Sequence, residues 1–220
     1  MKLTVFGATG GIGREIVRQA LTAGHEVTAV VRDPARLPED LSPAGPAQGD
    51  GARLQIVRAD LRDPEAVRPA VAGREAVLSG LGARRRADAG IATELTRTVL
   101  AAMAAEGVRR LVVVSAAPVG PSPEHQPPMD RAMIAVVKAV LKDVYADLRA
   151  MEHALAESAT DWTSVRPPRL TDAPLTGVYR TVVGGTPGKG RTIGRPDVAH
   201  AMLTAVTDPA TVKQGVGVAY

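Results

Sequence analysis

Short apolar runs alternate with longer amphipathic stretches through most of the chain. The apolar runs predict strands at 2–6, 26–31, 54–58, 75–79, 110–115 and 161–165. The amphipathic stretches predict helices at 12–23, 64–71, 89–106 and 130–157. Strands that alternate with helices form parallel sheets covered on both faces, so the pattern predicts an α/β fold with a doubly wound parallel sheet.

This alternation stops after Pro167, where short strand-like runs surround one predicted helix at 196–206 and a last strand follows. We interpret residues 1–220 as a single domain, with a core at 1–167 and a small substrate-covering lobe at 168–220. Two proline-containing stretches, 37–51 and 118–128, are predicted as surface loops.

A glycine cluster, Gly-Ala-Thr-Gly-Gly-Ile-Gly at 7–13, joins the first predicted strand to the first predicted helix. Gly7 allows the tight turn, Gly10 leaves room for a cofactor backbone, and Gly13 lets the helix pack close to the strand. The N–H groups of the first helical turn and the helix dipole both favour a pyrophosphate. The spacing therefore predicts a Rossmann-type, dinucleotide-binding domain. Its expected loop ligands are Gly7, Thr9, Gly10, Gly11, Ile12 and Gly13.

The end of the second predicted strand indicates which dinucleotide binds. A carboxylate there selects NAD, whereas an arginine accommodates the 2′-phosphate of NADP. Arg32 stands at this point, with Arg36 as a second candidate, and a planar guanidinium suits a phosphate. We therefore predict NADP, with NAD as the less favoured cofactor. The alternative is an exposed Arg32 with Asp33 capping the next turn.

Residues after the third, fourth and fifth predicted strands are further candidates. Asp60 is expected to accept a hydrogen bond from the adenine amino group, although it could instead cap a helix. Gly82 lets the backbone pass close to the cofactor, and Arg84 could reach its phosphates or simply be solvated. Ser115 is placed to bind the nicotinamide or the substrate, unless its hydroxyl satisfies local backbone groups.

A possible general acid lies on the long predicted helix, where Tyr145 and Arg149 are four residues apart and share a face. A cation beside a phenol lowers its pKa, which suits acid catalysis. The alternative is a packed tyrosine beside a solvated arginine. Of the four histidines, His125 is the one expected near substrate, and none has the spacing of a metal site.

Composition narrows the function further. The net charge is +4 without a basic stripe and aromatic residues make up 2%, so we expect no nucleic-acid partner. The absence of cysteine excludes disulfides and thiolate chemistry and fits a cytoplasmic location. No apolar run reaches membrane-spanning length and no leader is expected before the first strand. We expect a monomer or a small homo-oligomer.

The chain resembles the atypical short-chain dehydrogenase/reductase superfamily over nearly its whole length. The similarity is carried by Gly-Ala-Thr-Gly-Gly-Ile-Gly (7–13), Val-Val-Arg-Asp-Pro (30–34), Ala-Asp-Leu-Arg-Asp (59–63) and Asp-Trp-Thr-Ser-Val-Arg-Pro (161–167). It implies cofactor contacts at Leu61 and Pro167. Residues 166–179 are more specific and resemble the biliverdin-IXβ reductase/flavin reductase branch. That branch uses NADPH to reduce flavins and linear tetrapyrroles, and its active-site serine falls on Ser115.

Two positions depart from the family pattern. A histidine of the reductase branch is replaced by Arg169, which could still hold an anionic substrate. The superfamily's Tyr-x-x-x-Lys pair corresponds to Tyr145 and Arg149, one residue out of register, and this disfavours an epimerase or dehydratase. The sequence therefore predicts an NADPH-dependent reductase of a planar conjugated acceptor such as a flavin, quinone or tetrapyrrole. The alternative is a non-catalytic NAD(P)-binding redox sensor that acts through a protein partner.

Overall fold

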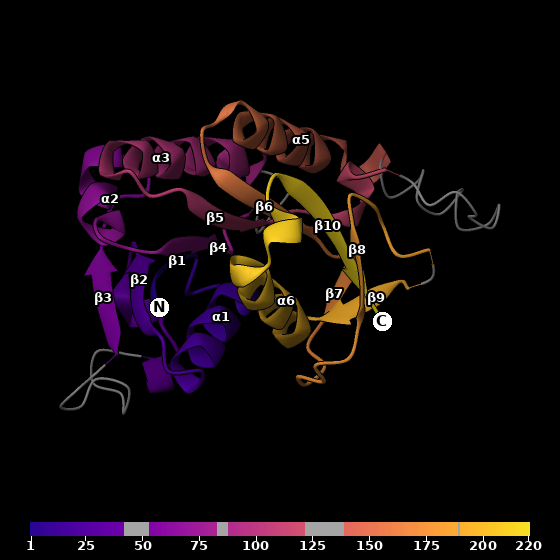
Figure 1. The fold of residues 1–220 in the computed structure, drawn as a ribbon, viewed down its shortest axis with the longest axis horizontal. Coiled ribbons are helices and arrows are strands. Elements are labelled where there is room, and N and C mark those ends of the chain that lie inside the picture. The colour runs from indigo at the N-terminus through magenta and orange to yellow at the C-terminus, as the bar shows by residue number, and fades with distance from the viewer. Residues whose placement is uncertain (42–52, 83–87, 122–138, 189) are drawn as a thin grey trace.

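A mostly parallel sheet forms the centre of the computed structural model, which describes residues 1–41, 53–82, 88–121, 139–188 and 190–220 (Figure 1). Within these residues, eight strands pair in the order β3-β2-β1-β4-β5-β6-β10-β8. The strands are β1 (Lys2–Phe6), β2 (Glu26–Val31), β3 (Leu54–Arg58), β4 (Ala76–Ser79), β5 (Arg110–Val114), β6 (Asp161–Arg166), β8 (Arg180–Val183) and β10 (Gln214–Ala219).

All strand pairs from β3 to β10 in this order are parallel, and β8 pairs antiparallel with β10. The sheet therefore confirms the predicted doubly wound architecture. The chain leaves β1 toward β2 on one side and later returns to β4 on the other. In sheets of this kind ligands bind at such a reversal, which here lies at the carboxyl ends of β1 and β4.

Helices cover both faces of the sheet, as predicted. One face carries α1 (Gly11–Thr22) and α6 (Arg195–Thr207), and the other carries α2 (Pro64–Val71), α3 (Ile91–Glu106) and α5 (Lys142–Glu157) (Figure 1). Successive residues of β5 point to opposite faces: Val112 packs on the α1–α6 side, and Leu111 and Val113 pack on the α2–α3–α5 side. No helix in the described ranges is long and apolar enough to cross a membrane.

A buried carboxylate ties α5 to α3. The N-terminal cap of α3 is Gly90, which offers no side chain to the first turn. Asp147 of α5 replaces it: its two oxygens accept hydrogen bonds from the backbone N–H groups of Ala92 and Thr93, each at 3.0 Å, and from the Thr93 hydroxyl at 2.6 Å. Short 3₁₀ turns lie in several connections of the described chain: η1 (Pro34–Arg36), η2 (Glu39–Leu41), η5 (Ala117–Val119) and η6 (Pro209–Thr211).

The predicted C-terminal lobe is divided between two structures. Strand β10 and helix α6 complete the main sheet and its helical layer, whereas β7 (Arg169–Thr171) and β9 (Thr192–Gly194) form a separate two-stranded parallel sheet. Asp197 of α6 is fully buried and connects α6 to the segment after β7 and to the C-terminal residue. It accepts hydrogen bonds from Tyr220, Thr176 and Gly177 at 2.6 to 3.0 Å. Burial alone would raise the pKa of Asp197, but these bonds lower it below its usual value.

Candidate cofactor site

Three glycines bring β1, α1 and β4 into backbone contact at the carboxyl edge of the sheet. Gly7 has a φ of +80°, and a Cβ there would lie 2.9 Å from the carbonyl carbon of Gly80. A Cβ on Gly13 would lie 2.1 Å from the Gly7 oxygen. Glycine at 7 and 13 is therefore required for the close packing itself, as the sequence predicted for the turn and for the helix.

Gly10 has a different surrounding. Its φ and ψ of −92° and 165° suit any residue, and its N–H donates to the Gly7 oxygen at 2.8 Å. Among the described residues, a Cβ on Gly10 would meet one atom within 4 Å, the Gly7 oxygen at 3.2 Å, and a Cβ on Gly82 would meet none. The first turn of α1 carries no acidic residue. This open, amide-rich turn fits a dinucleotide pyrophosphate.

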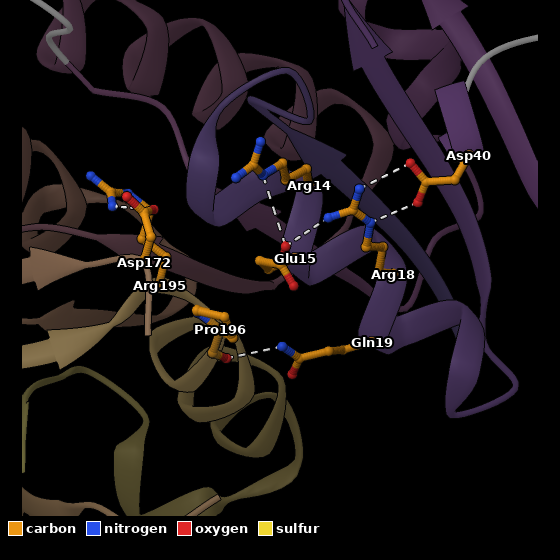
Figure 2. A network of polar contacts seen from close by, with 8 residues as sticks. All are labelled: Arg14, Glu15, Arg18, Gln19, Asp40, Asp172, Arg195 and Pro196. Carbon is orange, nitrogen blue, oxygen red and sulfur yellow. Dashed lines mark hydrogen bonds and ion pairs between the residues drawn. The ribbon is translucent and has the colours of Figure 1, made fainter. Parts of the chain in front are cut away.

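The space beside Gly11 is filled by a side chain, that of Arg195 near the C-terminal end of the chain. A Cβ on Gly11 would lie 2.5 Å from Cδ and 2.8 Å from Nε of Arg195. Arg195 begins α6, and its Nη1 is paired with Asp172 Oδ1 at 2.6 Å (Figure 2). Local sequence patterns gave no signal for this contact, because the two residues meet only through the packing of α6 on α1.

The end of β2 leaves Arg32 exposed. Within the described part of the chain its guanidinium has no hydrogen bond or ion pair. Asp33 caps η1 by accepting from the Ala35 N–H at 3.1 Å. The capping alternative is therefore correct for Asp33, and it leaves Arg32 available for a phosphate. The preference for NADP stays a prediction.

Asp60 follows β3 and is exposed. One of its carboxylate oxygens accepts from the Arg62 N–H at 3.0 Å, and Asp63 supplies the cap of α2 by accepting from the Glu65 N–H at 2.9 Å. Asp60 thus forms a local turn bond and does not cap a helix. Its neighbour Leu61 is buried in the core. Adenine binding by Asp60 and a cofactor contact by Leu61 stay predictions.

Ser115 has a buried hydroxyl without a partner. Its backbone N–H donates to the Val165 oxygen at 2.8 Å, which fixes the residue at the end of β5. The residue is 8% exposed, and Oγ has no hydrogen-bond partner within the described structure. The hydroxyl therefore does not satisfy local backbone groups, which was the alternative. Because a buried, unpaired hydroxyl is costly, this group is suited to a ligand.

Tyr145 is buried on α5 among the apolar residues of the α2–α3–α5 side. Burial raises the pKa of its phenol, and Arg149 is exposed and does not counter this effect. The expectation that Arg149 lowers the pKa of Tyr145 is therefore wrong. A phenol with a raised pKa stays protonated at neutral pH. The catalytic role of Tyr145 itself stays a prediction.

The end of β6 is held by a partly buried ion pair that the sequence did not reveal. Arg166 binds Glu152 of α5, with Nη2 to Oε2 at 2.6 Å, and Ser164 donates to the same carboxylate at 2.7 Å. The next residue, Pro167, is buried, and its oxygen accepts from the Ala117 N–H at 2.8 Å. These contacts fix the strand end that the resemblance assigned to the cofactor.

The remaining substrate candidates lie outside the glycine junction. Arg169 is exposed at the start of β7. Arg84 and His125 lie outside the described residues. In the described ranges, no three His, Asp or Glu side chains gather in a way that could hold a metal ion.

Comparison with known proteins agrees with this geometry. Two relatives are the 3-diazoavenalumate denitrifying reductase of a Streptomyces species, 36% identical over 162 residues, and the nitrogen metabolite regulation-like protein bik4 of Gibberella fujikuroi, 29% identical over 160 residues. These alignments cover 64% and 68% of the chain but only 49% and 46% of the relatives. The chain thus aligns with about half the length of these relatives.

Two solved structures show the same fold. A short-chain dehydrogenase/reductase of Veillonella parvula in complex with NADP superposes with a TM-score of 0.78 at 20% identity, covering 100% of this chain and 94% of that one. A Streptococcus pneumoniae protein provisionally named an NADH-flavin reductase gives 0.76 at 22% identity, covering 100% and 99%. The sequence matches the NAD(P)H-binding family over residues 7–209. The glycine junction, the open first turn of α1 and this match agree, and the chain belongs to the NAD(P)H-binding family.

Proposed function

We propose that this protein is an NADPH-dependent oxidoreductase that transfers hydride to a planar conjugated acceptor such as a flavin, a quinone or a tetrapyrrole. The observation that carries the proposal is the buried, unpaired hydroxyl of Ser115 at the same sheet edge as the open glycine turn. A site built only to bind a dinucleotide phosphate has no use for such a group. A site that orients a nicotinamide or its acceptor needs a hydrogen-bonding group of this kind.

The strand order supports this proposal, because it puts the glycine turn and Ser115 at a suitable separation. Ser115 follows β5, Gly7 follows β1, and β4 lies between these strands. Adjacent strands are about 4.8 Å apart, so the two positions lie about 10 Å apart across the edge. This spacing allows the glycine turn to hold a pyrophosphate while Ser115 reaches a nicotinamide.

In this proposal the protein contributes mainly placement. When bound, NADPH supplies the hydride. The first turn of α1 binds the pyrophosphate and Arg32 binds the 2′-phosphate. The Ser115 hydroxyl donates a hydrogen bond that orients the nicotinamide amide or the acceptor. The acceptor takes its proton from solvent, because Tyr145 is buried and its pKa is raised.

A non-catalytic redox sensor is the second candidate. The observation that favours it is the similarity to the nitrogen metabolite regulation-like protein. The raised pKa of Tyr145 is compatible with it as well, because a sensor needs no acid. The similarity to a denitrifying reductase and the unpaired Ser115 hydroxyl support the enzyme instead.

Two measurements on the unmodified protein separate these functions. The first is NADPH affinity by isothermal titration, and the second is steady-state NADPH oxidation with FMN, a small quinone or a linear tetrapyrrole. We expect tight binding together with oxidation that depends on at least one acceptor. Tight binding without oxidation for any acceptor supports the sensor. Absence of NADPH binding contradicts the proposed oxidoreductase.

A further inference from the structure

The contact between Arg195 and Gly11 has a chemical consequence beyond packing. The side chain of Arg195 crosses the first residue of α1, at the turn that faces the proposed pyrophosphate position. Its guanidinium is brought there by α6, which is fixed on α1: Gln19 of α1 donates to the Pro196 oxygen at 2.9 Å (Figure 2). The position of Arg195 is therefore set by regular structure and not by a loop.

The arginines at this point have carboxylate partners that are distant or exposed. A helix N-terminus carries a partial positive charge and normally attracts carboxylates. The first turn of α1 has none, and two arginines lie close by. The Nε atom of Arg14 is buried and has no hydrogen-bond partner in the described chain. It lies 3.8 Å from Glu15 Oε1, which is an ion-pair distance but too long for a hydrogen bond. Arg195 is paired with Asp172, whose side chain is 80% exposed and therefore well screened by water.

A cation beside the positive end of a helix is unfavourable unless an anion joins them. We propose that Arg195 is a ligand of the cofactor pyrophosphate, contributed by the C-terminal part of the chain. This inference rests on the proposed function, because it concerns the same dinucleotide site. On binding, the guanidinium exchanges the Asp172 carboxylate for phosphate oxygens, which bind arginine strongly. Gly11 is a glycine because the Arg195 side chain needs the space of its Cβ.

Arg195→Ala tests this role, with Arg109→Ala as its matched control. Arg109 is also an arginine paired with an aspartate, Asp161 at 3.1 Å, but it precedes β5 and so lies at the opposite edge of the sheet. Two probes are titrated into each variant: NADPH, and adenosine 2′-monophosphate, which has a 2′-phosphate but no pyrophosphate. We expect Arg195→Ala to weaken NADPH binding by at least about tenfold. Its affinity for adenosine 2′-monophosphate should stay within about twofold of the unmodified protein.

A second variant covers the case in which Arg195→Ala damages the fold. Asp172→Asn removes the competing carboxylate and keeps the arginine, so NADPH binding should tighten by about two- to fivefold, the range of an exposed ion pair. Weaker NADPH binding in Asp172→Asn would overturn the exchange. Equal NADPH affinity in Arg195→Ala and Arg109→Ala would overturn the proposal, as would an equal loss for both probes in Arg195→Ala.

These results are distinguishable from a failure of the proposed function. If the unmodified protein binds NADPH and Arg195→Ala binds it with equal affinity, only the role of Arg195 is wrong. If the unmodified protein binds no NADPH, the proposed function is wrong and the role of Arg195 with it. Gly11→Ala gives an independent check, because its Cβ must displace the Arg195 side chain. Its effect on NADPH affinity should disappear in the Arg195→Ala background.

Discussion

The same added methyl group should lower the stability of the fold at Gly13 and weaken cofactor binding at Gly10. At Gly13, the new Cβ would lie 2.1 Å from the oxygen and 2.5 Å from the carbonyl carbon of Gly7, which are backbone atoms that cannot turn aside. Overpacking of this kind costs about 1–3 kcal/mol, and we expect the upper end for Gly13→Ala. In a domain of this size, about 3 kcal/mol lowers the unfolding midpoint by about 6–12 °C.

Gly10→Ala should leave the fold nearly unchanged, because its backbone conformation suits alanine and its Cβ would have one neighbour, at 3.2 Å, among the described residues. We expect a change in stability within about 1 kcal/mol. The methyl group would instead occupy the space into which the pyrophosphate must fit. NADPH binding should weaken by at least about tenfold, which corresponds to about 1.4 kcal/mol.

Thermal unfolding followed by circular dichroism, with and without NADPH, measures both effects. At 100 times its Kd, NADPH stabilises the unmodified protein by about 2.7 kcal/mol. At the same concentration, tenfold weaker binding leaves about 1.4 kcal/mol, so the NADPH-induced shift of Gly10→Ala should fall to half or less. A full NADPH-induced shift in Gly10→Ala would refute the assignment of this turn to the cofactor. Equal destabilisation of the two variants would refute the distinction between them.

Five further predictions concern single side chains. Arg32→Ala should abolish a preference for NADPH over NADH of at least tenfold, measured by titration with both dinucleotides; equal affinities in the unmodified protein would contradict it. Ser115→Ala should lower turnover several-fold through loss of a hydrogen bond worth about 0.5–1.5 kcal/mol, without a lower unfolding midpoint. Tyr145→Phe should keep most of the turnover, and a hundredfold loss would indicate general-acid catalysis instead. Asp147→Ala should reduce the free energy of unfolding by about 2–3 kcal/mol in a denaturant titration, because two buried N–H groups lose their acceptor; an unchanged midpoint would disprove the cap. The pKa of Asp197 is lowered in the folded protein, so its contribution to stability is complete above about pH 3.9 and is lost as the pH falls below this value. Asp197→Asn should therefore lose less stability between pH 5 and pH 3 than the unmodified protein does.

The sequence predicted those parts of the fold that depend on local patterns. The apolar runs placed β1, β2 and β3 at their observed bounds, and the Asp63-Pro64 cap signal placed the start of α2. The glycine spacing located the turn between β1 and α1, because steric limits act on each glycine through its immediate neighbours. The predicted helix at 130–157 is observed from Lys142 onward, and residues 122–138 lie outside the described part.

Features that depend on distant residues could not be predicted in this way. Asp147 caps a helix that begins more than 50 residues earlier in the chain, and its own surroundings in sequence resemble an ordinary helix surface. Arg195 meets Gly11 only after α6 packs on α1. For Ser115, the sequence indicated the position, but its unpaired hydroxyl depends on what three-dimensional packing leaves around it. The raised pKa of Tyr145 likewise follows from burial and not from its spacing to Arg149.

The place of β10 in the sheet has a consequence for synthesis on the ribosome. β10 is made after β8, yet it lies between β6 and β8, and β8 has no other strand partner in the described sheet. Until residues 214–219 emerge, β6 is an open edge with unpaired backbone groups, and β8 has nothing to pair with. A partly synthesised chain can therefore hold its glycine turn and most of its core while it still offers two strand edges to other chains. Pausing within residues 184–213 should be the stage at which the nascent protein aggregates most easily.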